Sequence, residues 1–239
     1  MTILALDRVS KSYGALKVTD DISLSVAHGE TLGIIGPNGA GKTTLFNLIS
    51  GDVHVDHGRI VFAEQEITAL RPHARCRRGI GRSYQIPHPF TGMTVFENVL
   101  VAAAFGGSLS ESDAEPFCVE VLERTGLAPK SNQLAGSLTL LDRKRLELAR
   151  ALATRPKLLL LDEIAGGLTE HEAKELVALI QEIKATGMSL VWIEHVVHAL
   201  VAVADRMLVI HFGTKLAEGE PAAVLANPEV KRVYMGIEV

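Results

Sequence analysis

Short apolar runs alternate with helical stretches in the second half of the chain. The apolar runs are Lys157–Leu161, Ser189–Ile193 and Met207–Ile210, and the stretches between them, Glu170–Lys184 and His195–Ala204, show helical spacing. Strands that alternate with helices form parallel sheets, because each helical connection crosses back over the sheet before the next strand begins. We therefore predict an α/β fold built on a parallel sheet.

The first half of the chain adds three further patterns. Alternating runs at Ile3–Leu6 and Ile22–Val26 predict short antiparallel strands that form a minor sheet of their own. The compact apolar run Thr31–Ile35 predicts a buried strand. Lys42–Ser50, with apolar residues at helical spacing before Gly51, predicts a helix. A glycine-rich loop joins this strand to this helix.

The middle of the chain is helical in pattern. Between Val95 and Ala153 apolar residues recur at helical spacing, with breaks at 106–110 and 126–136, and we interpret this stretch as a helical subdomain inserted into the α/β core. We expect a single domain, 1–239, with a mainly antiparallel β part at 1–30, a core formed by 31–90 and 155–220, a helical part at 91–154 and a C-terminal helical tail at 221–239.

The composition excludes several classes of protein. Hydrophobic residues make up 47% of the 239 residues and charged residues 22%, which is not the composition of a disordered or collagen-like chain. The net charge of −4 argues against a general nucleic-acid binder. The longest apolar run, Val99–Phe105, is much shorter than the roughly 20 residues of a spanning helix. Because the N-terminus lacks the pattern of a secretory signal and Cys76 and Cys118 lack metal-ligand spacing, we expect a cytoplasmic protein.

The glycine-rich loop has the spacing of a phosphate-binding loop. Residues Gly36, Pro37, Asn38, Gly39, Ala40, Gly41, Lys42 and Thr43 satisfy G-x-x-x-x-G-K-[ST] between a predicted strand and a predicted helix. Glycines let backbone N–H groups converge on phosphate oxygens, and a helix N-terminus attracts anions. We expect Lys42 along the β and γ phosphates, the Thr43 hydroxyl toward Mg²⁺ and Thr44 at a further phosphate. A glycine-rich turn without a ligand is the alternative.

Three further residues are expected at the same edge of the sheet. Asp162 and Glu163 follow the apolar run 158–161, and parallel sheets bind ligands at this end of their strands. Asp162 suits the Mg²⁺ shell and Glu163 can act as general base toward water, although paired acids also serve as helix caps. The next strand ends at His195, which can donate to a γ-phosphate oxygen; a purely structural histidine is the alternative.

A cluster of arginines lies between the phosphate loop and the helical part. Its members are Arg71, Arg75, Arg77, Arg78 and Arg82. We interpret the cluster as a solvated helix face, with contact to anionic lipid as the alternative.

Taken in order, these motifs resemble the ATP-binding subunits of ABC transporters over essentially the whole chain. The order is SKSYG with Tyr13, the phosphate loop, RSYQ with Gln85, a helical insertion, LLLLDE and IEH. The resemblance implies a RecA-like P-loop NTPase fold with ATP and Mg²⁺ as ligands. It also implies that Tyr13 stacks on adenine, and that Gln85 contacts Mg²⁺ and the attacking water while its loop, Ile86–Thr94, touches a membrane partner. A turn tyrosine and a surface amide are the alternatives for these two residues.

Four stretches are similar to the branched-chain amino acid importers of the Liv type: GMTVFENVLVAA, DRKRLELARALATRPKLLLLDE, AGGLTEHE and EGEPAAVLANPEVKRVYMG. The resemblance then implies an ATP-hydrolysing clamp at the cytoplasmic face of the membrane. Its partners would be transmembrane permease subunits, a second ATPase subunit in a homo- or heterodimer and, indirectly, a periplasmic or extracellular solute-binding protein, without nucleic acid.

The segment that corresponds to the family signature LSGGQ departs from it. Here it reads Leu138-Thr-Leu-Leu-Asp142, in which Thr139 keeps a hydroxyl for a phosphate, Leu141 replaces a glycine, and Asp142 brings a carboxylate toward an anionic ligand. Thr139 with Asp142 also fits a helix-capping pattern. A second departure is Thr169, where the family usually has an acid or Asn. We therefore hypothesise that the chain works beside a non-identical ATPase subunit.

Two other functions share some of these motifs. A soluble ABC-type factor or nucleotide-gated scaffold usually joins two ATPase halves in one chain, whereas this chain has one phosphate loop. A small-molecule kinase would need an arginine-rich lid, for which the cluster between Arg71 and Arg82 is the candidate.

Overall fold

The strands form two sheets. The computed structural model describes residues 1–235, with the side chains of residues 111, 234 and 235 left aside. Among these residues the larger sheet has six strands in the order β10 (Thr214–Gly219), β9 (Arg206–His211), β3 (Thr31–Ile35), β8 (Ser189–Ile193), β7 (Leu158–Asp162) and β6 (Ile80–Ser83). Neighbours from β9 to β6 are parallel, and β10 is antiparallel to β9. The predicted α/β fold with a parallel sheet is confirmed.

The smaller sheet is antiparallel. Its order is β2 (Leu16–Ala27), β1 (Thr2–Tyr13), β4 (His57–Phe62) and β5 (Gln65–Glu66). The strands predicted at 3–6 and 22–26 have the correct direction, but their lengths were wrong, because each is part of a strand of 12 residues. Irregularities in the ladder, with positive φ at Arg8 and Asp21, let both strands continue past polar residues that would otherwise end them.

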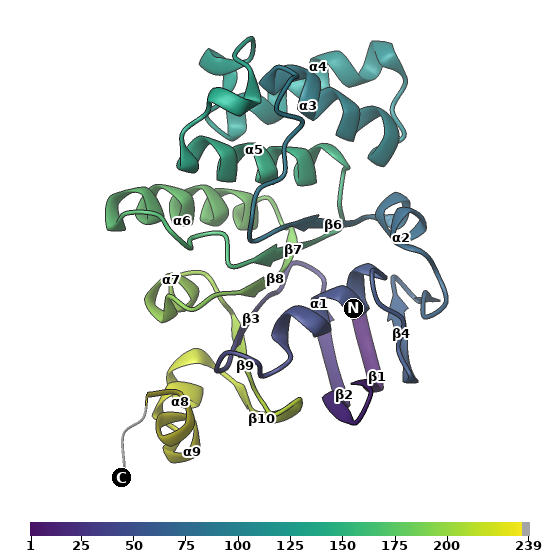
Figure 1. The fold of residues 1–239 in the computed structure, drawn as a ribbon, viewed down its shortest axis with the longest axis vertical. Coiled ribbons are helices and arrows are strands. Elements are labelled where there is room, and N and C mark those ends of the chain that lie inside the picture. Colours follow the sequence, from purple (N-terminus) through teal and green to yellow (C-terminus); the bar gives the residue numbers. More distant parts are fainter. Residues whose placement is uncertain (236–239) are drawn as a thin grey trace.

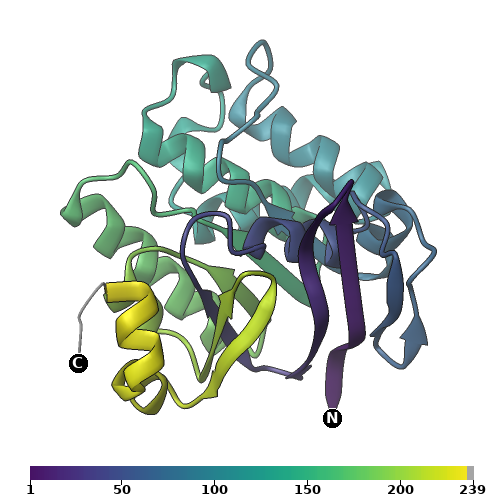
Figure 2. The ribbon, with the colours of Figure 1, turned by 60° about the horizontal axis from the view of Figure 1, so that its bottom comes forward.

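The helices lie on both sides of the larger sheet and at its β6 end (Figure 1). Helices α3, α4 and α5 gather beyond β6, whereas α8 and α9 lie at the opposite end of the molecule (Figures 1 and 2). The helices are α1 (Lys42–Ser50), α2 (Pro72–Arg78), α3 (Val95–Val101), the π-helical turn η1 (Ala102–Gly106), α4 (Glu111–Arg124), η2 (Ala128–Lys130), η3 (Ala135–Ser137), α5 (Leu140–Ala153), α6 (Glu170–Ala185), α7 (Val197–Val201), α8 (Pro221–Ala226), α9 (Pro228–Val230) and η4 (Lys231–Met235).

Two predicted helical regions differ in extent. The helix predicted over 195–204 is shortened to α7, because the N–H groups of His195 and Val196 bond to the Glu194 side chain rather than opening a helix. The predicted tail is helical from Pro221, where α8 begins with proline at its first turn. The last four residues of that predicted tail, 236–239, lie outside the described residues. Within residues 1–235, no helix has both the length and the apolar character that crossing a bilayer requires.

Two hydrophobic clusters fix the phosphate loop between rigid elements. One cluster lies between the two sheets and includes Leu45, Phe46 and Leu48 of α1, all fully buried. The other lies between the larger sheet and the helices on its far side. Strand β3 contributes to both, since Ile34 belongs to the first cluster and Ile35 to the second. This alternation buries both faces of β3 and holds the start of the loop at its end.

Candidate nucleotide-binding site

The loop between β3 and α1 packs closely against two other strands. Gly41 has φ +101, and a Cβ there would lie 2.3 Å from the Val18 carbonyl oxygen of β2. A Cβ at Gly36 would lie 2.2 Å from the Ile210 carbonyl oxygen of β9. The two glycines therefore let the loop sit between β2 and β9, with α1 beginning directly after it.

Lys42 is the first residue of α1, and its side chain lies against this loop. Its Nζ donates to the carbonyl oxygens of Gly36 at 2.7 Å and Pro37 at 3.1 Å, and the residue is only 5% exposed. Burial lowers the pKa of Lys42, while the nearby Glu163 and Asp162 carboxylates oppose that change. Residues 38–44, including Asn38, Gly39, Ala40, Thr43 and Thr44, line a pocket that Val18 and Glu163 complete. No sequence pattern pointed to Val18, because its place depends on how the β1–β2 hairpin folds back.

Asp162 lies at the end of β7 and is paired with an arginine. Nη2 of Arg82 lies 3.1 Å from Asp162 Oδ2, while Asp162 Oδ1 is buried and has no hydrogen-bond partner in the described structure. Burial raises the pKa of Asp162, and the Arg82 guanidinium opposes that rise. A buried, unpaired carboxylate oxygen costs free energy unless another group binds it.

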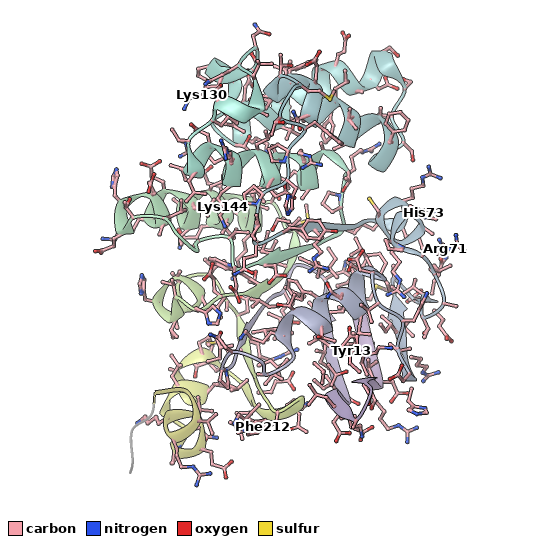
Figure 3. All side chains as sticks on the ribbon, viewed as in Figure 1. Tyr13, Arg71, His73, Lys130, Lys144 and Phe212 are labelled. Carbon is pink, nitrogen blue, oxygen red and sulfur yellow. The ribbon has the colours of Figure 1, made fainter. Side chains whose placement is uncertain are left out.

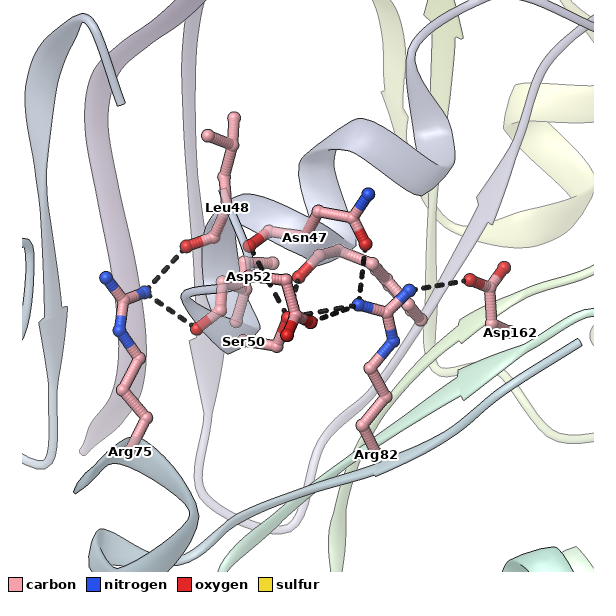
Figure 4. Close-up of polar contacts among 9 residues, drawn as sticks. Asn47, Leu48, Ser50, Asp52, Arg75, Arg82 and Asp162 are labelled. Carbon is pink, nitrogen blue, oxygen red and sulfur yellow. Dashed lines mark hydrogen bonds and ion pairs between the residues drawn. The ribbon is translucent and has the colours of Figure 1, made fainter. Parts of the chain in front are cut away.

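The arginine cluster is not a solvated helix face as a whole. Arg75 is 1% exposed and donates to the carbonyl oxygens of Thr68 and Leu70. It also donates to those of Leu48 and Ile49 in the final turn of α1, as Figure 4 shows. Arg82 donates to the Asn47, Ser50, Asp52 and Asp162 side chains (Figure 4). The prediction was wrong for these two residues, because they satisfy helix-end carbonyls and carboxylates that the sequence pattern does not reveal. Arg71, in contrast, lies exposed at the surface (Figure 3).

Gln85, Glu163 and His195 converge at the ends of three neighbouring strands. Glu163 Oε2 accepts from Nε2 of Gln85 at 2.5 Å, and Oε1 lies 2.8 Å from Nε2 of His195. Glu163 directly follows β7 and has φ +45, in the left-handed region that residues other than glycine rarely adopt. The structure therefore brings together three residues that the sequence singled out. Gln85 and Glu163 are about 80 positions apart in the chain and Glu163 and His195 about 30, yet all three lie at one edge of the sheet.

Two buried residues brace this trio and were not predicted as site residues. Glu194 accepts from the N–H groups of Ala165 at 2.8 Å and His195 at 3.0 Å, and burial raises its pKa. Lys144 of α5 donates to the Gln85 carbonyl oxygen at 2.6 Å. Both lie in stretches that carry the family resemblance, IEH and DRKRLELARALA, but no spacing in the sequence assigned a role to either side chain.

Tyr13 lies at the tip of the β1–β2 hairpin (Figure 3). It is 49% exposed, and the Lys11 ammonium lies 5.6 Å from its ring centre. The ring does not line the pocket of residues 38–44. The exposed Tyr13 ring could stack on adenine, and this role stays a prediction.

Thr139 caps the N-terminus of α5. Its hydroxyl oxygen accepts from the Asp142 N–H at 3.3 Å, and the hydroxyl donates to Asp142 Oδ2 at 2.8 Å. The Asp142 carboxylate is buried and also pairs with Lys130, with Arg145 4.0 Å away. The capping interpretation is confirmed, and the expected repulsion from Asp142 is weakened because two cations neutralise it. Thr169 likewise caps α6 in a capping box with Glu172.

The donor set fits a magnesium ion. Mg²⁺ is usually held by one or two protein oxygens together with phosphates and water, so the absence of a larger acidic cluster among the described residues is compatible with it. Thr43 lines the pocket of the loop, and the buried Asp162 Oδ1 has no other partner. Thr43 and Asp162, with the side-chain oxygen of Gln85 as the third expected ligand, are the residues that would hold the ion.

The fold and the loop geometry define a P-loop nucleotide hydrolase. A model of the ABC transporter family matches residues 19–166, and a model described as a branched-chain amino acid ATP-binding cassette transporter matches residues 214–239. The chain therefore belongs to the ABC transporter family and is one of its ATP-binding, ATP-hydrolysing subunits. Subunits of this family dimerise and work with membrane permease subunits.

Relatives with the same arrangement cover nearly the whole chain. The lipopolysaccharide export system ATP-binding protein LptB of Escherichia coli K12 is 34% identical over 236 residues, which cover 99% of this chain and 98% of that protein. The high-affinity branched-chain amino acid transport ATP-binding protein LivG of Salmonella typhimurium is 36% identical over 249 residues, with 98% of each covered. A solved ATP-binding cassette of an ABC transporter in its ADP conformation superposes with a TM-score of 0.91 at 33% identity, over 99% of this chain and 100% of that one.

Proposed function

We propose that this chain is the motor subunit of an ABC importer for branched-chain or related amino acids. The match of residues 214–239 to the branched-chain amino acid transporter model carries this proposal, because that segment is outside the part common to ABC ATPases in general. The similarity to LivG supports the same class. Lipopolysaccharide export is the second candidate, favoured by an equally complete match to LptB.

The catalytic roles follow from the trio and the loop. Glu163, held by Gln85 and His195, is the general base that takes a proton from the attacking water. Lys42, inside the loop, neutralises charge on the transferred phosphate, and His195 adds a donor there. Thr43, Gln85 and Asp162 would hold Mg²⁺, which would supply charge neutralisation on the phosphates. Residues 36–44 hold the phosphates, Tyr13 stacks on adenine, and Thr139 meets the nucleotide of the partner subunit.

A groove between α2, β6 and α5 is the proposed seat for the permease. Its lining includes Tyr84, Cys76, Ala102, Thr154 and Glu147. Tyr84 in its lining is itself exposed, and the exposed Phe90 ring lies beside Arg150, which also lines the groove; Ile86 and Phe105 are exposed as well. Exposed aromatic side chains around a groove are typical of a protein contact. Since Gln85 lies on the same loop as Ile86, a permease segment in this groove would respond to changes at Glu163.

The transport cycle proposed here is that of a clamp at the cytoplasmic face of the membrane. Two ATPase subunits close on two nucleotides, each held between one phosphate loop and the opposite signature helix. Closure moves the permease, and hydrolysis reopens the clamp. A solute-binding protein on the other side of the membrane would deliver the amino acid.

The test is transport by cells that carry or lack the gene. Deletion should abolish uptake of labelled leucine, isoleucine or valine, and the wild-type gene should restore it, whereas Lys42→Ala should not. Purification of the tagged chain from detergent-solubilised membranes should recover a multi-span permease. Normal amino acid uptake in the deletion strain, together with loss of lipopolysaccharide at the cell surface, would instead support the export function.

A further inference from the structure

Three residues on one face of α5 contact the loop that carries Gln85. Lys144, Glu147 and Arg150 occur at every third position, which places them along one side of the helix. Lys144 lies on the side of α5 toward the larger sheet (Figure 3). Its Nζ donates to the Gln85 carbonyl oxygen at 2.6 Å and lies 3.4 Å from the Glu163 carbonyl oxygen. Because α5 begins at the signature segment, these contacts join the signature to the hydrolytic residues of the same chain.

The other two residues hold the same loop further along. The Glu147 carboxylate is buried between Arg150 and the backbone of residues 84–88, which favours its ionised form, while burial raises its pKa. Nη1 of Arg150 donates to the His88 carbonyl oxygen at 2.9 Å and to Glu147 Oε2 at 3.0 Å. The Arg150 guanidinium also lies 5.2 Å from the centre of the Phe90 ring. Helix α5 and residues 84–90 are therefore bonded as one unit.

Lys144 is the member of this face that reaches the hydrolytic residues. It is only 4% exposed, and a buried ammonium costs free energy unless hydrogen bonds and opposite charges compensate it. Burial lowers the pKa of Lys144, which the carboxylates of Glu194 and Glu163 oppose. Both of its hydrogen bonds go to main-chain oxygens of the two residues whose side chains bond to each other. An apolar residue would fill the same space but would leave those two carbonyls without a common donor.

We propose that Lys144 is a positioning residue for ATP hydrolysis, which fixes Gln85 and Glu163 relative to each other through their main-chain carbonyls and ties both to the signature helix. This inference rests on the proposed roles of Gln85 and Glu163, and it adds the residue that fixes their relative position. Displacement of a catalytic group by about 1 Å can lower a rate by about 100-fold. Greater freedom of Gln85 and Glu163 would therefore lower turnover while the phosphate loop stays unchanged.

The test measures ATP hydrolysis by the purified full-length chain carrying Lys144→Met or Lys144→Arg. A substitution of a second lysine, Lys184→Met, is the control. Lys144→Met should lower kcat by about 10- to 100-fold, with KM for ATP and the Kd for ATP changed by less than about twofold. Lys144→Arg, which keeps a cationic donor, should recover kcat to within about fivefold of wild type. The control is Lys184→Met, because Lys184 also donates to a main-chain oxygen, that of Val203 at 2.7 Å, but on α6 beside α7. It should keep wild-type kcat.

Two results would overturn the proposal. One is a kcat of Lys144→Met within about twofold of wild type. The other is a parallel loss of ATP affinity and thermal stability in Lys144→Met, which a purely structural lysine would produce. If Lys144→Met does not fold, Lys144→Gln, which keeps a neutral donor of shorter reach, replaces it with the same expected loss of kcat.

A double-mutant cycle with Gln85→Ala separates this inference from the proposed function. Because Lys144 acts through Gln85 and Glu163, Lys144→Met should lower kcat by less than about threefold in a chain that already carries Gln85→Ala. Losses of kcat that are fully additive would contradict the inference. Failure of Gln85→Ala and Glu163→Gln to affect hydrolysis in the wild-type background would contradict the proposed function instead.

Discussion

Nε2 of His195 lies 2.8 Å from Oε1 of Glu163, and this contact joins the ends of the neighbouring strands β8 and β7. The second carboxylate oxygen accepts from Gln85 at 2.5 Å. The carboxylate is thus held on both sides by groups from two other segments of the chain. Replacement of Glu163 by glutamine removes the negative charge and keeps the size of the side chain, but its single oxygen can keep only one of these two contacts.

Glu163→Gln is expected to bind ATP and to fail in hydrolysis. The amide keeps the size of the side chain but cannot accept a proton from water, so kcat should fall by about 10²- to 10³-fold. The Kd for ATP should change by less than about twofold, because the loop that holds the phosphates is intact. Phosphate release and nucleotide titration measure these two quantities, and gel filtration with Mg·ATP should show a dimer that accumulates.

Glu66→Gln is the control for this substitution. Glu66 is an exposed acid on β5, outside the site, and its neutralisation should leave turnover unchanged. Steady-state hydrolysis at the wild-type rate in Glu163→Gln would remove Glu163 from the role of base.

The pH dependence of hydrolysis should report on Asp162. Because burial raises the pKa of this carboxyl above that of an ordinary aspartate, Asp162 takes up a proton sooner as the pH falls. A protonated carboxyl is a poor Mg²⁺ ligand, so activity should decline on the acid side at a higher pH than an unperturbed aspartate would give. The folded chain also binds this proton more tightly than the unfolded chain, so the contribution of Asp162 to stability decreases as the pH rises through its folded pKa.

Arg82→Met should shift the decline of activity on the acid side of the pH profile to a higher pH, nearer to neutral. The Arg82 guanidinium favours the ionised form of Asp162, and its loss raises the pKa further. The Mg²⁺ concentration for half-maximal hydrolysis at fixed acidic pH should therefore increase. Arg82→Lys, which keeps the positive charge, should shift the pH of this decline less than Arg82→Met does. Superimposable pH profiles for Arg82→Met and wild type, in chains that both remain folded by circular dichroism, would contradict the coupling.

Periodicity and local motifs were sufficient for the phosphate loop and for four of the six strands of the larger sheet, β3, β7, β8 and β9, whereas β6 and β10 were not predicted. Strand 189–193 has the predicted bounds, and the loop lies between a strand and a helix as G-x-x-x-x-G-K-[ST] requires. The meeting of Glu163 and His195 follows from the rule that parallel strands present their ends at one edge, whereas Gln85 was expected only through the resemblance, because the strand before it was not predicted. In these cases the information is local in the sequence or follows from topology.

Contacts between distant segments could not be predicted in this way. Arg75 and Arg82 have the same local pattern as the exposed Arg71, and only the fold shows that they meet the end of α1 and the carboxylate of Asp162. Val18 reaches the phosphate pocket because the β1–β2 hairpin bends past its irregularities. Periodicity describes which face of an element is buried, but it contains no information on which other element covers that face.

Arg75 should contribute far more to stability than its neighbours. Its guanidinium donates to four carbonyl oxygens, and the burial that this requires lowers its pKa to about 10. Arg75→Met would leave those carbonyls without donors, at a net loss of about 1 kcal/mol for each hydrogen bond, so the free energy of unfolding should fall by about 2–4 kcal/mol. Urea unfolding followed by circular dichroism measures this change.

Arg77→Met provides the matched comparison, because Arg77 belongs to the same helix and is exposed. Its substitution should change the free energy of unfolding by less than about 0.5 kcal/mol. Equal losses for the two variants would show that the hydrogen bonds of Arg75 do not stabilise the end of α1.

The cap of α5 allows the two roles proposed for Thr139 to be measured separately. Thr139→Ala removes the hydroxyl that accepts from the Asp142 N–H, so the free energy of unfolding should fall by about 1 kcal/mol. If the hydroxyl also meets the nucleotide of the partner subunit, hydrolysis should fall by about tenfold as well, which corresponds to the loss of one hydrogen bond to a charged group. Thr139→Ser, which keeps a hydroxyl, should retain both stability and turnover.

Asn227→Ala is the matched cap variant, since Asn227 accepts from the Glu229 N–H at the start of α9. It should lose a comparable amount of stability while its rate of hydrolysis stays within about twofold of wild type. The comparison decides the role of the altered signature: turnover in Thr139→Ala no lower than in Asn227→Ala would leave Thr139 as a helix cap alone. The contact across the dimer would then have to come from the main-chain N–H groups at the start of α5, which no side-chain substitution at this position removes.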